Sequence, residues 1–561
     1  MHLFDLLFGG LFFGGLRHPG VHAAAASVLW ALAYVFPPAL SRLPGARIWA
    51  AWLGWLLISA LLSAEPLRGL SAFSYNAAAV LFLSVFRTRL DEKTRLYWLP
   101  LSAAAATVLC LAAFLIRTPS RPMIGLLFPY YNYTTAFAAA FISAAVAAWC
   151  HGRWNGKLRY LYAGAALLCL AEIVAAGSRG ALIAAAGASA FALWQSGRKR
   201  IVLYGGLLLF ALLLAAPNPW LRSRLKLSHL GAQVRPAIWD AAVSVANESP
   251  FFGEGPGQFD RGFLRHQFPT PESHRPTRFG ISTKHAHSQH LQQAAETGWP
   301  ALSLFLIALF ALWKNRKKDR DSAAAGAAAA SMLVTGFFEN TFAMPAFFWY
   351  FLSALAICAP LPKGEPSPCA KLRPALALGL CLSLFAWWPK FETGRRRTAA
   401  FARSGPESIQ TMLGALAISP RDGDLWSDLA YLYARRGALR PGLQAILQAE
   451  RLHPTNAVYF LRSAEFLRRM GEWDAVRDKA LTALALEPVC PPAHLFLAEA
   501  HLNKGEKTSA ARELENALRS YSPEKFDRGY DQSIRMLDTR RYGELRVKLQ
   551  NLMPTPESRP L

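Results

Sequence analysis

The sequence predicts an all-α fold: a polytopic membrane helical bundle of about 12–13 spans, with a large external loop and a C-terminal α-solenoid. Three observations predict it. Of the 561 residues, 53% are hydrophobic and only 17% are charged, whereas a soluble domain usually carries about 25% charged residues. Long apolar runs recur through residues 1–390, and a spacing of 34 residues recurs in the C-terminal third.

The apolar runs predict the membrane spans, because each is close to the length needed to cross about 30 Å of hydrocarbon. Residues 3–16 would add one further short span. The predicted spans lie near residues 21–40, 48–63, 70–86, 97–116, 126–149, 158–176, 181–195, 201–216, 299–313, 322–340, 343–359 and 374–389.

The formal net charge of +25 does not indicate nucleic-acid binding, because many basic residues form short clusters between apolar runs. One alternate set of loops holds 20 basic residues and the opposite short loops hold four. The positive-inside rule makes the first set cytoplasmic, in a bacterial inner membrane. The loop 217–298 and everything after the last span are then extracytoplasmic. The basic cluster at 395–397 departs from this rule, and the repeats would be cytoplasmic if 374–389 did not cross.

Prolines, alanines and glycines repeat at intervals of 34 residues after the last span: Pro420, Pro454 and Pro488; Ala430, Ala464 and Ala498; Gly437, Gly471 and Gly505. This period resembles the tetratricopeptide repeat, whose small residues let paired helices approach. Three units fit within about 413–520. Such stacks usually bind a protein on their concave face, so we expect a protein partner there. Support of the external loop or self-association is the alternative.

These features divide the chain into five predicted parts. They are an N-terminal transmembrane bundle at 1–216, an extracytoplasmic catalytic loop at 217–298, C-terminal transmembrane helices at 299–390, a linker at 391–412 and the TPR-like domain at 413–561.

The external loop is the expected site of chemistry, because loops this long are usually functional. It contains nine basic and six acidic residues and six of the 13 histidines, which suits an anionic, lipid-linked substrate. Three segments stand out: Arg235 to Trp239, at the start of an amphipathic helix; Gly253 to Phe259, a glycine turn that resembles a phosphate loop only superficially; and Lys284 to Gly298, which runs into the next span.

The order of these segments resembles the O-antigen ligase and polymerase superfamily. They read Arg-x-x-x-Trp, Gly-x-Gly-x-Gly-x-Phe and His-Ala-His-Ser-x-x-Leu-Gln-x-x-x-Glu-x-Gly; members often have His-Asn where this chain has His287-Ser288. Two membrane-edge segments also fit, Tyr130-Tyr131-Asn132-Tyr133 and the Ser-Arg-Gly element of Gly177-Ser178-Arg179-Gly180-Ala181. The resemblance covers roughly 125–345, and some members carry similar C-terminal repeats.

The resemblance implies an enzyme that transfers a glycan from undecaprenyl pyrophosphate to an acceptor hydroxyl, without metal, nucleotide or other cofactor. The leaving diphosphate needs cations, and Arg179 and Arg235 are the expected clamp. His287 is the expected general base, because histidine titrates near working pH. The expected substrate-binding residues are Asn132, Trp239, His285, His290, Arg261 and Arg265.

Other interpretations of these residues remain open. Arg179 lies at a membrane edge, so it could simply extend its charged end to the interface. Arg235 could be an ordinary cation at the start of a helix. The spacing of His285, His287 and His290 would suit zinc, but no carboxylate lies nearby in sequence to complete a hydrolytic site. The seven cysteines show no metal-type pairing, so no metal is expected.

Four functions are consistent with the sequence. The first is a ligase that attaches the glycan to a lipid acceptor or, as a protein O-oligosaccharyltransferase, to a protein. A polymerase of the same family is the second. A polysaccharide transporter and an envelope scaffold are alternatives from other classes. The expected partners are the lipid-linked glycan, its lipid or protein acceptor, and membrane lipids, with no nucleic acid.

Overall fold

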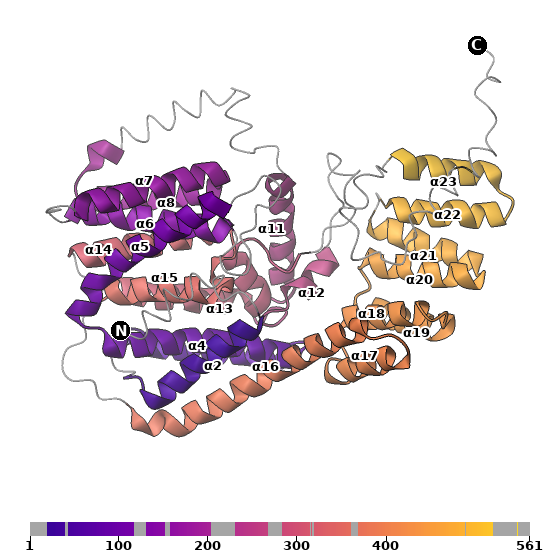
Figure 1. Ribbon diagram of the computed structural model, residues 1–561, viewed down its shortest axis with the longest axis horizontal. Coiled ribbons are helices and arrows are strands. Elements are labelled where there is room, and N and C mark those ends of the chain that lie inside the picture. The colour runs from indigo at the N-terminus through magenta and orange to yellow at the C-terminus, as the bar shows by residue number, and fades with distance from the viewer. Residues whose placement is uncertain are drawn as a thin grey trace, which may run out of the picture. The chain divides into compact units, whose positions relative to one another are not determined.

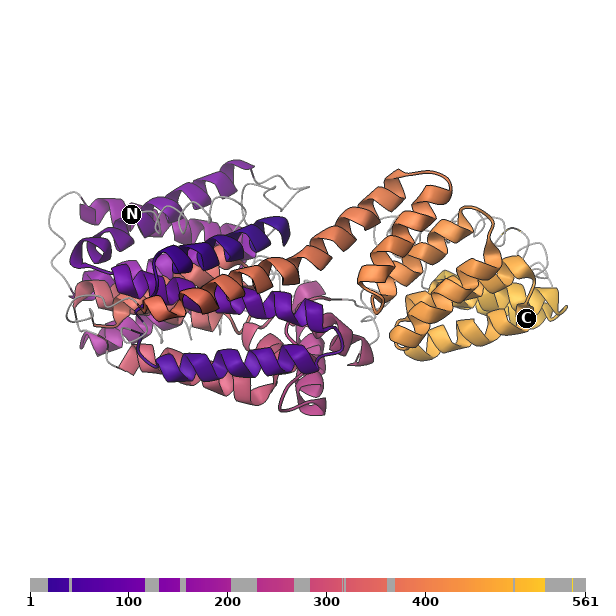
Figure 2. The same ribbon diagram turned by 90° about the horizontal axis from the view of Figure 1, so that it is seen from below.

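The computed structural model describes residues 19–39, 43–116, 131–151, 158–202, 230–266, 283–314, 316, 319–360, 369–487, 490–519 and 547. Every regular element in these segments is a helix (Figures 1 and 2), which confirms the all-α prediction. The chain forms two compact units. One contains residues 1–259 and 285–388, and the other contains 260–284 and 389–561.

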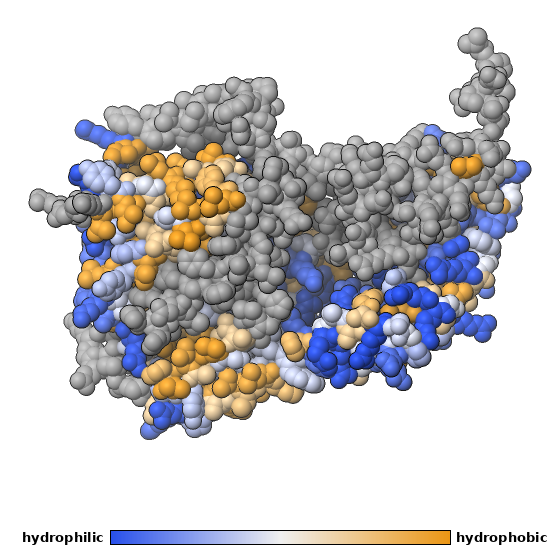
Figure 3. All heavy atoms as spheres, in the orientation of Figure 1, coloured by the Kyte–Doolittle hydropathy of each residue, from blue (hydrophilic) through white to orange (hydrophobic). Residues whose placement is uncertain are grey.

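The first unit is a bundle of apolar helices. In the described part of the chain, α4, α5, α6, α7, α13 and α16 are long and apolar enough to cross a membrane, and α2, α3 and α15 contain shorter apolar helices. Hydrophobic residues cover the outer faces of α7 and α16 (Figure 3). The chain is therefore a multi-pass membrane protein. Its helices are α2 (Pro19–Val35), α3 (Ala46–Leu62), α4 (Pro66–Arg89), α5 (Glu92–Ile116), α6 (Tyr131–His151), α7 (Leu158–Ala176), α8 (Arg179–Gln195), α11 (Leu230–Glu248), α13 (Gln289–Lys314), α14 (Arg320–Thr335) and α15 (Pro345–Cys358).

Small side chains, chiefly alanine, explain how the centre of this bundle packs. Helix α15 is buried along its entire length, and α14 packs against both α6 and α8. The contact faces of α6 and α14 are mostly alanine, and the alanines between 136 and 148 are nearly all buried. Small side chains let helix backbones approach closely, which is the usual basis of helix association in lipid.

Two predicted segments differ from the observed helices, and two predicted spans cannot be compared with them. The predicted span 322–340 ends early, because α14 stops at Thr335 and a turn follows it. The predicted loop 217–298 contains the whole of α11 and the first turns of α13. The predicted spans 3–16 and, apart from its first two residues, 201–216 lie outside the described residues.

The second unit is a stack of helical hairpins. The pairs are α18 (Gly423–Ala434) with α19 (Leu439–Leu452), α20 (Ala457–Met470) with α21 (Trp473–Leu486), and α22 (Pro491–Asn503) with α23 (Lys507–Arg519). The turns within the pairs contain Gly437, Gly471 and Gly505 at φ angles of 71°, 82° and 79°, a left-handed conformation that favours glycine. This arrangement confirms the TPR-like solenoid.

A further hairpin precedes the three predicted repeats. Helix α16 (Arg373–Ala402) extends into this unit, and α17 (Pro406–Ile418) follows it. Ala400 and Phe401 at the end of α16 pack into the same core as the α18–α19 pair. Most of the predicted linker 391–412 is therefore helical and belongs to the solenoid core.

The glycine turn at residues 253–257 attaches the loop after α11 to the start of α13. The backbone NH groups of Glu254 and Gly255 donate to the carbonyls of Ala295 and Glu296, at 3.0 and 2.8 Å. A Cβ on Gly255 would lie 2.2 Å from Ser63 Cβ. The glycines therefore permit close backbone packing, and the turn has a structural role.

Gly298 marks the point where α13 changes direction. Its φ of 80° interrupts the helical backbone, and a Cβ there would lie 2.0 Å from the carbonyl oxygen of Phe251. The next NH, of Trp299, donates to the carbonyl of Pro250 at 2.9 Å. The bend and the hydrogen bond together hold the start of α13 against the loop.

We predict that Gly298→Ala destabilises the protein by about 2–4 kcal/mol, because it combines a left-handed alanine with a backbone clash. Thermal unfolding in detergent measures this as a lower apparent Tm. Gly187→Ala in α8 is the matched control, since nothing lies within 4 Å of a Cβ there. Equal Tm values for the two variants would contradict the structural role of Gly298.

Candidate functional site

The turn between α14 and α15, residues 336–344, is the centre of the candidate site; we call it the acidic turn. Side chains from three helices hold its backbone. Tyr75 of α4 donates to the carbonyl of Phe342 at 2.6 Å, and Tyr133 of α6 to that of Asn340 at 3.3 Å. Gln289 of α13 accepts from the NH of Phe342 at 3.2 Å. The acidic turn is thus fixed by residues distant in sequence.

Three predicted site residues converge on one carboxylate in this turn. Glu339 is 8% exposed. It accepts from Arg235 Nη2 at 2.9 Å and Asn132 Nδ2 at 2.7 Å, and His287 Nδ1 lies 3.2 Å from its other oxygen. Arg235 Nη1 also donates to the carbonyl of Phe338 at 2.8 Å. The structure therefore brings Arg235, His287 and Asn132 together.

The electrostatics of this group favour an ionised carboxylate. Burial raises the pKa of Glu339, but the hydrogen bond from His287 and the charges of Arg235 and His287 outweigh burial and hold the pKa below its ordinary value of 4.5. An ionised carboxylate only accepts hydrogen bonds. Nδ1 of His287 therefore carries a proton in this contact, and in the neutral ring Nε2 is the proton acceptor.

His287 has an unusual backbone conformation. Its φ of 49° is the one positive value among the described non-glycine residues, and such strain persists only where surrounding contacts enforce it. The NH of the preceding Ala286 donates to Gln292 Oε1 at 2.7 Å, and Gln292 Nε2 donates to Glu296 Oε1 at 2.6 Å. The NH of Gly257 donates to Glu296 Oε2 at 2.8 Å. These hydrogen bonds connect the histidine loop to the glycine turn.

These contacts explain several positions of the histidine motif. Gln292 and Glu296 link the glycine turn to the residue before His287 through a chain of hydrogen bonds. Ser288 immediately precedes α13, and its Oγ accepts from the NH of Leu291 at a long 3.5 Å. Serine and asparagine are both favoured at a helix N-cap, so the departure from His-Asn at His287-Ser288 keeps the capping function.

Arg179 lies beside this group but does not contact Glu339. It is the first residue of α8, is partly exposed and makes no ion pair among the described residues. The next residue, Gly180, packs so closely on the acidic turn that a Cβ would lie 2.8 Å from Phe338 Cβ. The first turn of α8 therefore adjoins the turn that contains Glu339, and it carries a cation that has no acidic partner in the described part of the chain.

The other predicted substrate-binding residues have different surroundings. The Trp239 ring lies 6.4 Å from the Phe338 ring, one helical turn from Arg235. His285 is exposed, with Nδ1 3.1 Å from Asn340 Nδ2. His290 is buried, and its Nε2 lies 3.2 Å from the carbonyl of Leu333. Its burial and contact fit a structural role at the end of α14.

Arg261 and Arg265 belong to the second unit. Arg261 lies in α12 (Phe259–Phe263) and Arg265 in the 3-10 turn Leu264–His266, both in the segment assigned to that unit. Among the described residues, no three histidine, cysteine, aspartate or glutamate side chains are placed to hold a metal ion.

Sequence reasoning missed Glu339 because it assigned residues 322–340 to a span. A signal was present: Glu339 and Asn340 are adjacent polar residues at the end of an apolar run. A charge at the edge of a predicted span often marks a functional site.

A comparison with protein families bears on the first unit. Residues 164–306 match the family model described as O-antigen ligase. None of the curated proteins compared matches the chain.

Three solved structures are similar to the chain at low identity. They are "MamA MSR-1 C2" (17% identity, TM-score 0.19, 26% of this chain and 75% of that chain), yeast Tom70 (12%, 0.22, 80% and 85%) and the APC/C hetero-tetramer Cut9-Hcn1 (11%, 0.20, 82% and 77%). TM-scores this low carry no argument about the fold.

The matched region contains Arg179, Arg235 and His287. It lies within residues 125–345, where the motifs resemble the same family. A match to the O-antigen ligase family in a multi-pass membrane protein indicates a glycosyltransferase-type enzyme. The resemblance is therefore confirmed: residues 164–306 of this chain match the O-antigen ligase family model.

Proposed function

We propose that this protein transfers a glycan from undecaprenyl pyrophosphate to an acceptor hydroxyl, with His287 as the general base. The observation that carries the proposal is the His287–Glu339–Arg235 group, where the histidine Nδ1 lies 3.2 Å from a buried carboxylate. A carboxylate in this position orients the imidazole and stabilises the imidazolium that forms when it takes a proton.

In the proposed step, Nε2 of His287 removes the proton of the acceptor hydroxyl. The hydroxyl oxygen forms a bond to the anomeric carbon, and the bond from that carbon to the pyrophosphate oxygen breaks. Undecaprenyl pyrophosphate leaves with the electron pair. Direct displacement inverts the anomeric centre. No metal is needed, because cationic side chains stabilise the departing diphosphate.

The two arginines have different roles in this proposal. Arg235 forms an ion pair with Glu339 at 2.9 Å, so its charge is largely compensated while its remaining NH groups can still donate. Arg179 has no acidic partner among the described residues, and it supplies the uncompensated charge for the diphosphate. Both side chains offer the planar donor geometry that suits phosphate oxygens.

Asn132 donates to the same carboxylate oxygen of Glu339 as Arg235 does. Trp239 and His285 line the path by which the acceptor enters. Arg261 and Arg265 remain proposed contacts for the glycan or diphosphate. We place the site and the solenoid on the extracytoplasmic side of the inner membrane, with a protein partner on the concave face of the solenoid. The acceptor is a lipid or protein in a ligase and a second carrier-linked glycan in a polymerase.

The test is incubation of the purified protein with a carrier-pyrophosphate-linked glycan, in the presence of EDTA, with each acceptor class in turn. Transfer to one acceptor establishes the reaction and identifies the acceptor together. Binding of the glycan without transfer to any acceptor would favour a transporter or scaffold.

We predict that His287→Ala lowers kcat by about 10²–10⁴-fold, the range that a general base contributes, with little change in apparent Tm. His494→Ala is the matched control. It removes the histidine of another His–Glu pair, with Glu513 at 2.6 Å, in the solenoid. Normal turnover by His287→Ala would contradict the proposed base.

We predict that Glu339→Gln lowers kcat by about 10²-fold or more while KM changes little, because an amide neither orients nor stabilises the imidazolium as a carboxylate does. Steady-state kinetics separate the two parameters. Glu513→Gln in the solenoid pair is the control. A variant whose KM rises while kcat is unchanged would assign Glu339 to substrate binding instead.

The pKa of Glu339 also sets a pH dependence of stability. A carboxylate with a lowered pKa contributes stability that is complete above its ordinary value of 4.5 and is lost as pH falls through the lower, folded value. The Tm difference between the native protein and Glu339→Gln is therefore expected to stay constant from neutral pH to about 5 and to shrink only below that. A difference that disappears between pH 7 and 6 would contradict this assignment.

A further inference from the structure

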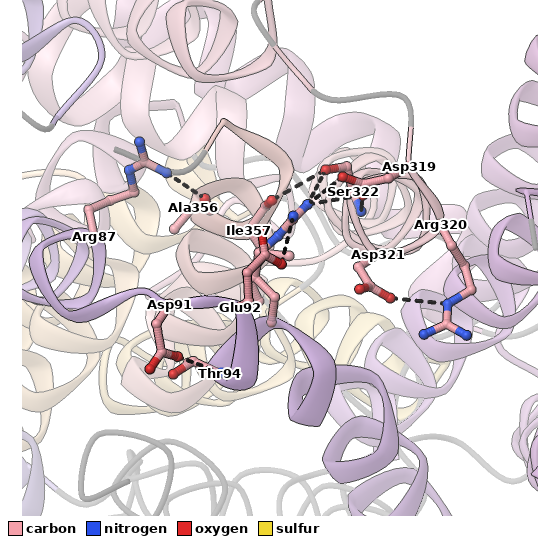
Figure 4. A network of polar contacts seen from close by, with 11 residues as sticks. Arg87, Asp91, Glu92, Thr94, Asp319, Arg320, Asp321, Ser322, Ala356 and Ile357 are labelled. Carbon is pink, nitrogen blue, oxygen red and sulfur yellow. Dashed lines mark hydrogen bonds and ion pairs between the residues drawn. The ribbon is translucent and has the colours of Figure 1, made fainter. Parts of the chain in front are cut away.

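The end of α14 opposite the acidic turn carries a network in which every labelled acid is already engaged (Figure 4). Buried Arg95 donates to Asp319 at 3.0 and 3.1 Å and to Ser322 at 2.6 Å. Arg320 pairs with Asp321 at 3.1 Å. Three of the four labelled acids have a basic partner, and Asp91 accepts from the backbone NH of Thr94 at 2.7 Å.

Arg87 at the same end is a structural cation as well. It is 3% exposed, and it donates to the carbonyl oxygens of Ala356 and Pro360 at 3.0 and 2.9 Å. These carbonyls lie at the C-terminal end of α15. A cation there donates to carbonyls that have no partner within the helix and interacts favourably with the helix dipole. The acids and the buried arginines are thus used to join α4, α5, α14 and α15.

A different set of cations at the adjoining helix ends has no acidic partner among the residues that the structure describes. We call Arg198, Lys199 and Arg316, with the tryptophans beneath them, the cationic rim. None of these three makes an ion pair among the described residues. Arg198 and Lys199 follow α8, and Arg316 follows α13.

Each rim cation lies over a tryptophan ring. Arg198 Cζ lies 4.2 Å from the ring centroid of Trp149 at the end of α6. Lys199 Nζ lies 5.1 Å from the ring of Trp194, and Arg316 Cζ lies 4.5 Å from the ring of Trp313.

The three cations belong to one surface. Arg198 Nη1 lies 3.8 Å from Cys150 Sγ, which places the end of α8 against the end of α6. The Phe191 ring of α8 lies 6.3 Å from the Trp313 ring of α13, so α13 adjoins the same place. The rim therefore spans three helices.

The rim borders an exposed apolar surface. Trp149 and Trp194 are 51% and 54% exposed, and Phe191, three residues before Trp194 in α8, is 44% exposed. Tryptophan is enriched at the level of lipid headgroups, with acyl chains on one side and water on the other. Cations that lie over such rings are therefore at the level of the membrane where the phosphate group of a phospholipid joins its acyl chains.

We propose that the cationic rim is a binding site for an anionic phospholipid, with the phosphate between Arg198, Lys199 and Arg316 and the acyl chains along α6 and α8. A cation over a ring face keeps its NH groups directed outward for phosphate oxygens. A lipid fits better than an acidic protein, because only a lipid also covers the apolar surface that continues from the rings.

The experiment measures retention of phosphatidylglycerol and phosphatidylcholine by native mass spectrometry of the full chain, with apparent Tm in each lipid as a second readout. Each basic residue near an anionic surface contributes about fivefold in affinity. We expect the triple variant Arg198→Gln, Lys199→Gln, Arg316→Gln to bind phosphatidylglycerol about 100-fold more weakly, while its binding of phosphatidylcholine is unchanged.

A matched control removes three exposed arginines of the α18–α19 turn that also lack an ion pair among the described residues: Arg435→Gln, Arg436→Gln, Arg440→Gln. It should bind phosphatidylglycerol as the native protein does, within about twofold. Trp149→Ala, which keeps all the charge, should lose part of the preference for the anionic lipid.

Three outcomes would overturn the proposal. The triple variant, folded by its lipid-free Tm, binds phosphatidylglycerol normally; or the native protein binds both lipids equally; or inorganic phosphate or a polyglutamate peptide displaces the bound lipid at equal concentration. The last outcome would assign the rim to a soluble anion or an acidic protein.

Discussion

The buried carboxylate of Glu339 is the constraint on which the candidate site depends. A buried charge is tolerated only with partners that compensate it, and Glu339 recruits them from three separate parts of the chain. Its partners Arg235, Asn132 and His287 lie 104, 207 and 52 residues away in sequence. Because all three contact one carboxylate, α6, α11, the histidine loop and the α14–α15 turn are held in a single arrangement.

Close backbone approach makes that arrangement possible. Gly180 lets the first turn of α8 contact Phe338, and Gly255 and Gly298 let the loop after α11 lie against α3 and α13. The glycine motif thus acts on the site indirectly. Through Glu296 and Gln292 it holds the left-handed backbone of His287, which would otherwise relax to a more favourable conformation.

The two ends of α14 have a similar distribution of charge. At the acidic turn, one carboxylate is shared by two basic residues, and Arg179 nearby makes no ion pair among the described residues. At the other end, Arg95 and Arg87 are buried and satisfied, while the cations on the tryptophan rings are not. In both places the buried pairs stabilise the helix packing, and the uncompensated cations are the groups available to bind phosphate.

Elements that form through contacts between residues close together in the chain could be predicted from the sequence. An apolar run long enough for the hydrocarbon core forms a helix in lipid whatever its neighbours are, so α4 to α7 were predictable. The spacing of Pro420, Ala430 and Gly437 and their equivalents determined the solenoid, because each repeat packs only on the next. The motif order located Arg235, His287 and Arg179.

The contacts among Arg235, His287 and Glu339 could be seen only in the tertiary structure. Glu339 looked like the end of a span because its partners are far away in sequence. His287 was predicted as the base and His290 as a substrate contact, and the observed contacts of both come from distant segments. One histidine is buried against Leu333 and the other is held against a carboxylate. Hydrogen bonds and ion pairs between distant segments depend on how helices pack, and no local pattern encodes that geometry.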